Sequence, residues 1–350
     1  MGTQWKSRIA IVGFGRWGAR YWDPLVDAGA SVVIVDPEAR PAHDDHRPHF
    51  ESLSDLLNSS VTVEGAIVAT PAFTHFAVAS QLLSAGIGVL VEKPFSTSLF
   101  EAKTLYSLAE QNHVSVASGH LLLHHPGICS LWEDIRDGVL GELVTLHAVR
   151  TALGRIRSDE DVLWSFGPHD IATILAMRQQ VPARVEAHCM FLRESEQADV
   201  VSITLTYASG QRDAVFLSWV GPVRQRHLMA FGSRATSMFD ELSEPHLTST
   251  LLESICNEEV TERPRSENFH SKSLLAEQVQ WFIETVSKRT VAKSDRQLAL
   301  TVSCILELAD LSCRRNTVVD VAPIYDIDGS PVTPSIFSPP SFARQTGNES

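Results

Sequence analysis

A glycine-rich turn between a strand pattern and a helix pattern constrains the fold of this chain more than any other feature. The apolar run Arg8–Val12 is typical of a short buried strand, and Gly13-Phe14-Gly15-Arg16-Trp17-Gly18 follows it directly. Residues 16–28 then have the spacing of a helix. In such a unit the first glycine permits a tight turn, the second lets the backbone approach a pyrophosphate, and the third lets the helix pack on the strand. The unit predicts a dinucleotide site with the helix N-terminus facing the phosphates; a turn that binds no nucleotide is the alternative.

An acidic residue stands where a dinucleotide site needs one. A second apolar strand, Ser31–Val35, ends at Asp36, 18 residues (36 − 18) beyond Gly18. A carboxylate there accepts hydrogen bonds from the adenosine ribose and repels the 2′-phosphate of NADP, so we expect NAD rather than NADP as the cofactor. Arg40 leaves NADP as the alternative, because a guanidinium at that place could pair with the phosphate.

Strand and helix patterns alternate as far as about residue 122, which predicts a doubly wound parallel sheet. The expected strands are Gly65–Ala69, Ile87–Val91 and Val114–Gly119, and the expected helices cover residues 53–57, 74–86 with Thr74 as cap, and 96–113 with Ser96 or Ser98 as cap. Residues 41–50 are expected to form a polar loop. The turn Ala69-Thr70-Pro71, with His75 shortly after it, lies at the carboxyl edge of this sheet, where it can line the cofactor.

A charged turn ends the strand Ile87–Val91. The residues Glu92-Lys93-Pro94-Phe95 follow it, and a proline cannot continue a central strand ladder. Ligands of open α/β sheets bind at the carboxyl ends of the strands. The pKa of a lysine held there is tuned by burial and by neighbours such as Glu92. A surface lysine in a turn is the alternative for any lone Lys-Pro pair, but the position of Lys93 after a nucleotide-binding sheet favours a functional residue.

The second half of the chain has a different pattern. A strand is expected over Leu143–Leu153, then a segment with Arg155 and Arg157, then an apolar helix over Asp161–Met177 with His169 near its opening. Apolar runs between Ala198 and Asp240, separated by glycines, predict a meander of antiparallel strands. Residues 243–270 resemble a long loop, and helices are expected over Ser273–Lys288 and Ser294–Arg315. These patterns predict a dinucleotide-binding domain at 1–122, an α/β domain at 123–322 for substrate binding and oligomerisation, and a loose Pro/Ser-rich tail at 323–350.

Composition excludes several classes of protein. The formal charge of −13 argues against nucleic acid as a partner, because phosphate backbones attract basic surfaces. No apolar run approaches the roughly 18 residues of a membrane helix, and residues 1–8 do not resemble a signal peptide. The five cysteines are scattered and never form a CxxC pair, so we expect reduced thiols in the cytoplasm and no zinc site. His120 and His124 are four apart across a strand end, a spacing that does not favour a metal site.

Several of these motifs occur together and in one order. They are GFGRWG at 13–18, Asp36, ATP at 69–71, VEKPF at 91–95, and HHPG at 124–127 followed by GELVTLHAVR at 141–150. From about residue 6 to about residue 315 the chain resembles the glucose–fructose oxidoreductase / inositol dehydrogenase / MocA (Gfo/Idh/MocA) family of NAD(P)-dependent enzymes. The resemblance implies an N-terminal Rossmann domain and a C-terminal α/β domain with a large, open, mostly antiparallel sheet. That second sheet is implied to form the interface of a homodimer or homotetramer.

The resemblance also implies roles for individual residues. His169 is implied to lie by the nicotinamide and the substrate hydroxyl and, with Lys93, to form the catalytic pair. The family places an Asp four residues before this His; here that residue is Ser165, so Asp161 or Asp170 could take its role. The expected cofactor-binding residues are Gly13, Phe14, Gly15, Arg16, Trp17, Gly18, Asp36, Thr70, Pro71, His75, Glu92 and Lys93. The expected substrate-binding residues are Lys93, Arg150, Arg155, Arg157, Ser165, His169 and Asp170.

The chemistry that we expect is hydride transfer between NAD and a secondary ring hydroxyl of a sugar. A His, with an ordinary pKa near 6.5, is suited to take the hydroxyl proton, and a Lys can polarise the same oxygen. If Arg150, Arg155 and Arg157 grip an anionic group instead of facing solvent, a nucleotide sugar or sugar acid fits better than a free cyclitol. The alternatives are reduction of a keto nucleotide sugar, a cyclitol or inositol dehydrogenase, transient oxidation that enables elimination, and an NAD-binding sensor without turnover.

Overall fold

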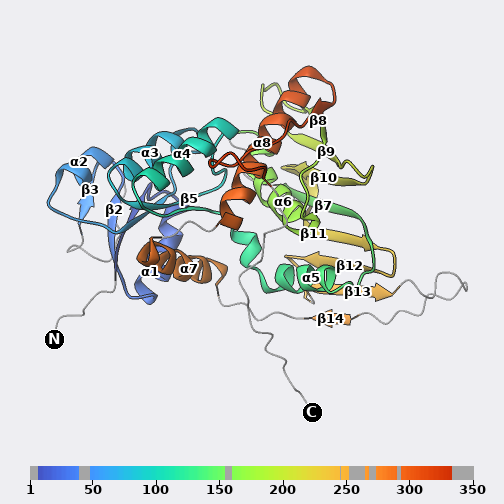
Figure 1. The fold of residues 1–350 in the computed structure, drawn as a ribbon, viewed down its shortest axis with the longest axis horizontal. Helices are drawn as coiled ribbons and strands as arrows, with labels where there is room; N and C mark the ends of the chain where they lie inside the picture. The colour runs from blue at the N-terminus through green and yellow to red at the C-terminus, as the bar shows by residue number, and fades with distance from the viewer. Residues whose placement is uncertain are drawn as a thin grey trace, which may run out of the picture.

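Two β-sheets organise the part of the chain that the structure describes (Figure 1). The structure is a computed structural model of the 350-residue chain, and it describes residues 7–38, 48–153, 160–244, 246–251, 265–267, 273–289 and 293–332. The first sheet is parallel and the second is mostly antiparallel, so the predicted fold class is confirmed.

The first sheet has the doubly wound order β3-β2-β1-β4-β5-β6, with every pair parallel. Its strands are β1 (Ser7–Val12), β2 (Ala30–Val35), β3 (His49–Phe50), β4 (Gly65–Val68), β5 (Gly88–Val91) and β6 (Val116–Ser118). Along β1, Ile9 and Ile11 enter the core on one face while Ala10 and Val12 enter the core on the other. A strand that is buried on both faces is continuously apolar, which is why sequence patterning identifies these strands. Strand β3 is the exception, since it falls within the expected loop at 41–50.

Helices cover both faces of this sheet. Helices α3 (His75–Ser84) and α4 (Leu99–Gln111) lie on one face, while α1 (Trp22–Asp27) and α7 (Leu274–Lys288) lie side by side on the other (Figure 1). Two short 3₁₀ segments, η1 (Gly18–Tyr21) and η2 (Ala72–Thr74), precede α1 and α3, and α2 (Leu53–Asn58) follows β3. The helix expected over 16–28 therefore begins later, as a 3₁₀ turn.

A hydroxyl side chain caps one of the two helices for which a cap was expected. Ser98 accepts a hydrogen bond from the backbone N of Glu101, so α4 starts at Leu99 and not at Ser96. Thr74 precedes α3 but makes no cap hydrogen bond, and its hydroxyl lies 2.7 Å from the carbonyl oxygen of Pro71. Sequence spacing alone does not show which of these hydroxyls forms a cap.

The second sheet has nine strands in the order β14-β13-β12-β11-β7-β10-β9-β8-β15. Its strands are β7 (Leu143–Leu153), β8 (Arg184–Met190), β9 (Val200–Thr206), β10 (Arg212–Ser218), β11 (Val220–Gly232), β12 (Ala235–Asp240), β13 (Leu247–Leu251), β14 (Arg265–Glu267) and β15 (Val319–Asp320). Strand β7 pairs in parallel with β10 and antiparallel with β11, so it separates two strands that a simple meander would join. The expected meander over 198–240 is therefore wrong for the pair β10 and β11, which are not neighbours in the sheet. The expected loop at 243–270 is also wrong, because it contains β13 and β14.

Helices α5 (Pro126–Arg136), α6 (Val162–Arg178) and α8 (Lys293–Arg315) pack on one face of the second sheet. Helices α6 and α8 lie between the two sheets (Figure 1). Near the start of α8, Asp295 accepts hydrogen bonds from the Ser118 hydroxyl at 2.6 Å and from the Tyr106 hydroxyl at 3.0 Å. One long helix therefore ties the second sheet to the carboxyl end of β6.

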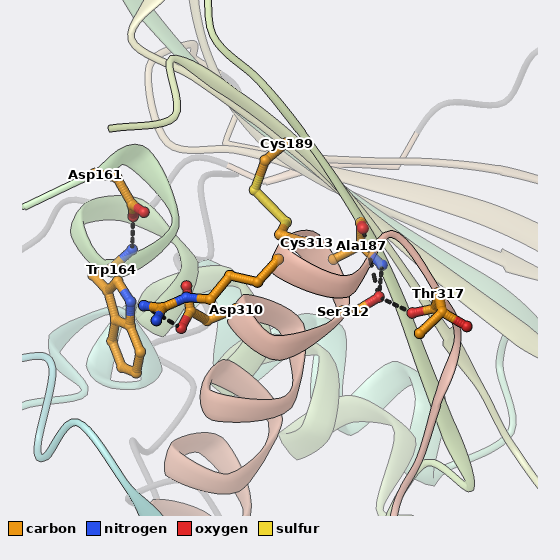
Figure 2. The surroundings of a disulfide bond; sticks show 9 residues. Asp161, Trp164, Ala187, Cys189, Asp310, Ser312, Cys313 and Thr317 are labelled. Atoms are coloured by element: carbon orange, nitrogen blue, oxygen red, sulfur yellow. Dashed lines mark hydrogen bonds and ion pairs between the residues drawn. A yellow bond between two sulfur atoms is a disulfide. The ribbon is translucent and has the colours of Figure 1, made fainter. Parts of the chain in front are cut away.

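A disulfide joins Cys189 on β8 to Cys313 in the last turn of α8, with 5.4 Å between their Cα atoms (Figure 2). The expectation that these two cysteines are reduced thiols is wrong. The argument from cysteine usage to the cytoplasm therefore fails for this pair. Cys129 and Cys304 are free and buried, and Cys256 lies outside the described residues.

The segment after α8 is better ordered than its composition suggests. Ile324 and Val332 are buried in the core of the first sheet, and the guanidinium of Arg296 lies 2.8 Å from the carboxylate of Asp326. Residues 323–332 therefore fold against α8, where a loose tail was expected; residues 333–350 lie outside the described part. In the described ranges no helix combines the length and the apolar character that a membrane crossing requires.

Candidate active site

The expected cofactor residues lie where the strands of the first sheet end. The glycine-rich turn follows β1, Asp36 follows β2, Thr70 follows β4 and Lys93 follows β5. The chain leaves β1 toward β2 on one side and crosses from β3 to β4 on the other, and such a change of direction is where open α/β sheets bind their ligands. The parallel order therefore brings together residues that are far apart in the sequence.

Two glycines make the turn after β1 possible. Gly13 has φ of +89°, and a Cβ there would lie 2.7 Å from the backbone N of Thr70. A Cβ on Gly18 would lie 1.9 Å from the carbonyl oxygen of Gly13, so the helix could not approach. Gly15 differs, because a Cβ there would meet no atom within 4 Å. The turn is thus held by close backbone contacts and has open space at Gly15, which fits a pyrophosphate at this position.

Asp36 is tied to the same turn. Its carboxylate accepts hydrogen bonds from the backbone N of Phe14 at 2.7 Å and from the backbone N of Glu38 at 2.9 Å. The half-buried ring of Phe14 packs edge-on against Trp22, and Arg16 is exposed. Asp36 therefore holds the glycine turn against the end of β2. Arg40, which could pair with the 2′-phosphate of NADP, lies outside the described residues.

Glu92 connects the turn after β5 to the glycine-rich turn. It is buried, and its carboxylate accepts hydrogen bonds from the indole N–H of Trp17, the hydroxyl of Tyr21 and the backbone N of Lys93. Burial and the negative charge of Glu92 raise the pKa of Tyr21, which keeps that phenol a donor. Trp17 and Glu92, both expected to contact the cofactor, are thus bonded to each other.

His75 lies between the turn after β4 and the turn after β5. Its ring is buried, with Nδ1 2.8 Å from the carbonyl of Pro94 and Nε2 2.8 Å from the carbonyl of Thr70. The hydroxyl oxygens of Thr70 and Thr74 lie 2.7 Å apart. His75 was expected to bind the cofactor. Each ring nitrogen faces a backbone carbonyl, and the neutral ring can donate a hydrogen bond to one of them, so His75 joins the Thr70-Pro71 turn to the Lys93-Pro94 turn, while its contact with the cofactor stays a prediction.

Lys93 reaches from the first sheet to helix α6. Its Nζ donates a hydrogen bond of 3.0 Å to the backbone carbonyl of Ser165. A carbonyl oxygen therefore stands opposite the ammonium at the residue where the resemblance implies an Asp. Neither proposed substitute fits that role: the side chain of Asp161 caps α6 through the backbone N of Trp164, and that of Asp170 binds Arg150.

His169 lies in the middle of α6, one turn beyond Ser165, and not near the start of the helix as expected. Burial lowers the pKa of His169 well below its usual value near 6.5, and the positive charges of Arg150 and Lys93 lower it further. The ring is therefore neutral near pH 7. Lys93 lies in the turn after β5 and His169 lies in α6. The contact of Lys93 with Ser165 in α6 brings the two residues into the same region.

A buried charge network lies beside His169. Arg150 binds Asp170 through two hydrogen bonds of 2.7 and 3.1 Å, and binds Glu241 at 3.2 Å. Glu241 also pairs with Arg226, which faces Arg150 across the β7–β11 ladder. Burial alone would lower the pKa of Arg150, but Asp170 and Glu241 raise it above its ordinary value.

The network changes the role expected for Arg150 and Asp170. Both side chains are buried and bound to each other, although they also line a small cavity with Thr173 and Arg226. Arg150 was expected to grip an anionic part of the substrate, but its guanidinium is already held by two carboxylates. Arg155 and Arg157, the other expected anion-binding residues, lie outside the described residues.

His120 also lies in this region, although the sequence pattern raised it only as a possible zinc ligand. It follows β6 at the same sheet edge and precedes the 3₁₀ segment η3 (Leu121–His124). Among the described residues, no cluster of His, Cys, Asp or Glu is suited to hold a metal. The sequence signal that could have identified His120 is its place directly after a strand of the nucleotide-binding sheet.

Comparison with known proteins identifies the first domain. Residues 7–120 match a family described as "Oxidoreductase family, NAD-binding Rossmann fold". A UDP-N-acetylglucosamine 3-dehydrogenase from Acidithiobacillus ferrooxidans is 32% identical over 208 residues, which are 58% of this chain and 64% of that protein. An inositol 2-dehydrogenase from an Arthrobacter species is 30% identical over 40% of this chain and 44% of its own length. The alignments thus span less than two thirds of these relatives.

Solved structures extend the likeness to almost the whole chain. The UDP-N-acetylglucosamine 3-dehydrogenase of A. ferrooxidans superposes with a TM-score of 0.75 at 22% identity, over 88% of this chain and 98% of that one. An inositol dehydrogenase homologue from Azotobacter vinelandii, complexed with NADH and myo-inositol, superposes with a TM-score of 0.78 at 18% identity, over 91% and 98%. At these identities the likeness concerns the fold.

Proposed function

We propose that this chain, a member of the Gfo/Idh/MocA oxidoreductases through the match of residues 7–120, transfers a hydride between NAD and a secondary ring hydroxyl of a sugar. The observation that carries the proposal is the meeting of Lys93 with α6, where the ammonium bonds the carbonyl of Ser165 one helical turn from His169. This contact supports the proposal, because it brings an ammonium and a neutral imidazole near the sheet edge at which we expect the cofactor.

NAD would be held by the turn after β1 and by Asp36. The open space at Gly15 accommodates the pyrophosphate, and the carboxylate of Asp36 accepts from the adenosine ribose. Arg16, Thr70 and Pro71 would complete the contacts. We favour NAD over NADP because the 2′-phosphate of NADP would meet the negative charge of Asp36. When bound, NAD accepts the hydride that leaves the carbon atom of the substrate.

His169 is the base in this proposal. Its ring is neutral at pH 7, so it can accept the proton of the substrate hydroxyl as the hydride leaves. Lys93 donates a hydrogen bond to the same oxygen and polarises it. The positive charges of Lys93, Arg150 and Arg226 that disfavour a protonated His169 also favour negative charge on that oxygen. The same positive charges thus keep His169 unprotonated and make it easier for the substrate hydroxyl to lose its proton.

A nucleotide sugar or sugar acid is the substrate class that we favour. A relative that aligns over 58% of the chain is named for action on a UDP-sugar, which supports this class over a free cyclitol. The named inositol dehydrogenases keep a cyclitol as the second candidate. Reduction of a keto nucleotide sugar would use the same residues in the opposite direction.

A substrate panel with one matched pair of variants tests the proposal. Purified protein is incubated with NAD and UDP- or dTDP-sugars, or myo-inositol, while the absorbance of NADH is followed. Lys93→Met should abolish turnover and leave NAD affinity unchanged, whereas Lys103→Met, on the outer helix α4, should change neither. Turnover that survives in Lys93→Met would refute the role of Lys93. Tight NAD binding without turnover on any sugar would favour a sensor over an enzyme.

We also propose that the open face of the second sheet forms the interface of a homodimer or homotetramer. Strand register places Phe216 beside Val149 on β7, and places Met229 on β11 beside Met238 on β12. Phe216 and Met238 are 40% and 39% exposed. The two pairs lie in neighbouring cross-strand rows of the same face, and a patch of exposed apolar side chains is the kind of surface that a second copy covers.

A further inference from the structure

His120 occupies a position between the catalytic lysine and helix α6. The backbone of Gly119 packs so closely on the turn after β5 that a Cβ there would lie 2.9 Å from Cα of Glu92 and 3.2 Å from the backbone N of Lys93. On its other side, η3 packs against α6, with Leu122 and Leu123 in the same core as Leu163. His120 therefore stands at the junction of the two elements that carry Lys93 and His169.

Both ring nitrogens of His120 are buried without a hydrogen-bond partner, and the residue is only 5% exposed. Other buried histidines nearby differ. His75 has a carbonyl at each nitrogen, and Nδ1 of His125 accepts a hydrogen bond from the backbone N of Gly127. A buried polar group without a partner destabilises the folded state, because it has lost its hydrogen bonds to water and gained none in return. In the described part of the chain, His120 is the histidine that carries this cost at both nitrogens.

The neighbours of His120 do not remove that cost. The ring of His124, the nearest other imidazole in η3, packs on Trp281 with 5.6 Å between ring centroids. Burial and His124 lower the pKa of His120 to about 4, so the ring is neutral near pH 7. A neutral imidazole has one N–H donor and one acceptor nitrogen. A hydroxyl group, which both donates and accepts, is the complement of either nitrogen.

We propose that His120 is a third residue of the site that touches the substrate, where it hydrogen-bonds a ring hydroxyl of the sugar held between Lys93 and His169. The inference rests on the proposed function, since it assumes that a polyhydroxylated ring occupies this junction. Ser165 provides no charged side chain in α6, and His120 supplies a polar contact from the opposite, sheet side of the site. His120 would then select for a ring that carries a second hydroxyl near the one that is oxidised.

The test compares two substitutions at His120 with a control at His124. His120→Leu has a similar volume and no polar atom, while His120→Gln keeps a donor and an acceptor. His124→Phe keeps the aromatic contact with Trp281. Melting temperatures of the protein without ligands, the Kd for NAD, and kcat and KM with UDP-N-acetylglucosamine or myo-inositol are measured for each variant.

His120→Leu should raise the melting temperature, because it removes a buried group that has no partner, and should lower kcat/KM by roughly 10- to 100-fold at an unchanged Kd for NAD. His120→Gln should recover part of that activity, and His124→Phe should retain activity within a few-fold. A histidine that merely supports the fold would give the opposite sign, namely a lower melting temperature for His120→Leu and unchanged kinetics, which would overturn the inference. A loss confined to NAD affinity would also overturn it, because the partner would then be the cofactor.

The two proposals fail in different ways. If the wild-type protein turns over none of the sugars, the proposed function fails. The melting temperature of His120→Leu still decides whether the imidazole is held for a ligand, and a value below the wild type then rejects the inference. If the wild type is active and His120→Leu equals it, the function stands and the inference fails.

Discussion

The pKa of His169 sets the pH range over which this residue can accept a proton. Burial lowers that pKa well below 6.5, and the positive charges of Arg150 and Lys93 lower it further. Because a lowered pKa keeps the imidazole neutral, we expect kcat/KM for oxidation to stay level as the pH falls from 7.5 to about 6, with its acidic limb below the ordinary histidine range. A pH–rate profile measures this. An acidic limb at or above pH 6.5 would contradict the cationic surroundings assigned to His169.

Asp36 accepts a hydrogen bond from the glycine-rich turn, and under the proposed function the same carboxylate also binds the cofactor. In Asp36→Ser, the hydrogen bond to the backbone N of Phe14 weakens and the charge that repels a 2′-phosphate is lost. We expect the KM for NAD to rise by about tenfold, the effect of one charge-assisted hydrogen bond, and the KM for NADP to fall. Initial rates with both cofactors provide the measurement, with Glu38→Gln as the control on an exposed neighbouring acid. An unchanged ratio between the two cofactors would show that Asp36 does not select between them.

Individual residues show what a sequence can predict about this site. The spacing of Gly13, Gly18 and Asp36 predicts their positions because backbone geometry fixes them. The hydrogen-bond partners of side chains cannot be predicted in the same way. Nothing in the sequence indicates that His75 lies between two carbonyl groups, or that Arg150 is bound by Glu241, 91 residues later. Those contacts depend on how distant elements pack, and only the folded chain determines them.

At the scale of elements, α8 is held at both of its ends. Asp295 near its start binds Ser118, and Cys313 in its last turn is joined to Cys189 (Figure 2). The hydroxyl of Ser312 also donates to the carbonyl of Thr317 and accepts from the backbone N of Ala187. The cross-link closes a loop with a sequence separation of 124, so it restricts the unfolded chain strongly.

Reduction should therefore destabilise the protein. We expect Cys189→Ser, or a reductant added to the wild type, to lower the free energy of unfolding by about 2–4 kcal/mol. Denaturant titrations with and without the reductant measure the change. The double variant Cys189→Ser/Cys313→Ser should not respond to the reductant, which makes it the control. If mass spectrometry of the oxidised protein finds both thiols free, the bond does not form in solution.

Strand patterns predict elements better than they predict neighbours. The bounds of β7 agree with the sequence pattern, but its insertion between β10 and β11 does not follow from it. A long connection through α6, β8 and β9 separates β7 from its parallel partner β10, and the pattern of each strand is the same in either order. Strand β13 was missed because its central residues, Thr248 to Thr250, are half-buried and polar and therefore show no alternation.

For the whole molecule, the fold class follows from sequence, whereas the assembly depends on which face of the second sheet stays uncovered. Helices α5, α6 and α8 cover one face, and the partly exposed side chains of Phe216 and Met238 lie on the other. Burying apolar surface contributes about 25 cal/mol per Å², and a stable interface buries about 800 Å² per partner.

Two negative charges introduced at Phe216 and Met238 should break the proposed oligomer. We expect Phe216→Glu/Met238→Glu to shift the protein to the mass of one chain in light scattering after size-exclusion chromatography, because two carboxylates would lose their hydration at the interface. The control is Phe100→Glu, an exposed aromatic on α4 at the opposite part of the molecule, which should leave the mass unchanged. The wild type should elute as a dimer or tetramer. A wild type with the mass of a single chain at micromolar concentration would contradict the proposed oligomer.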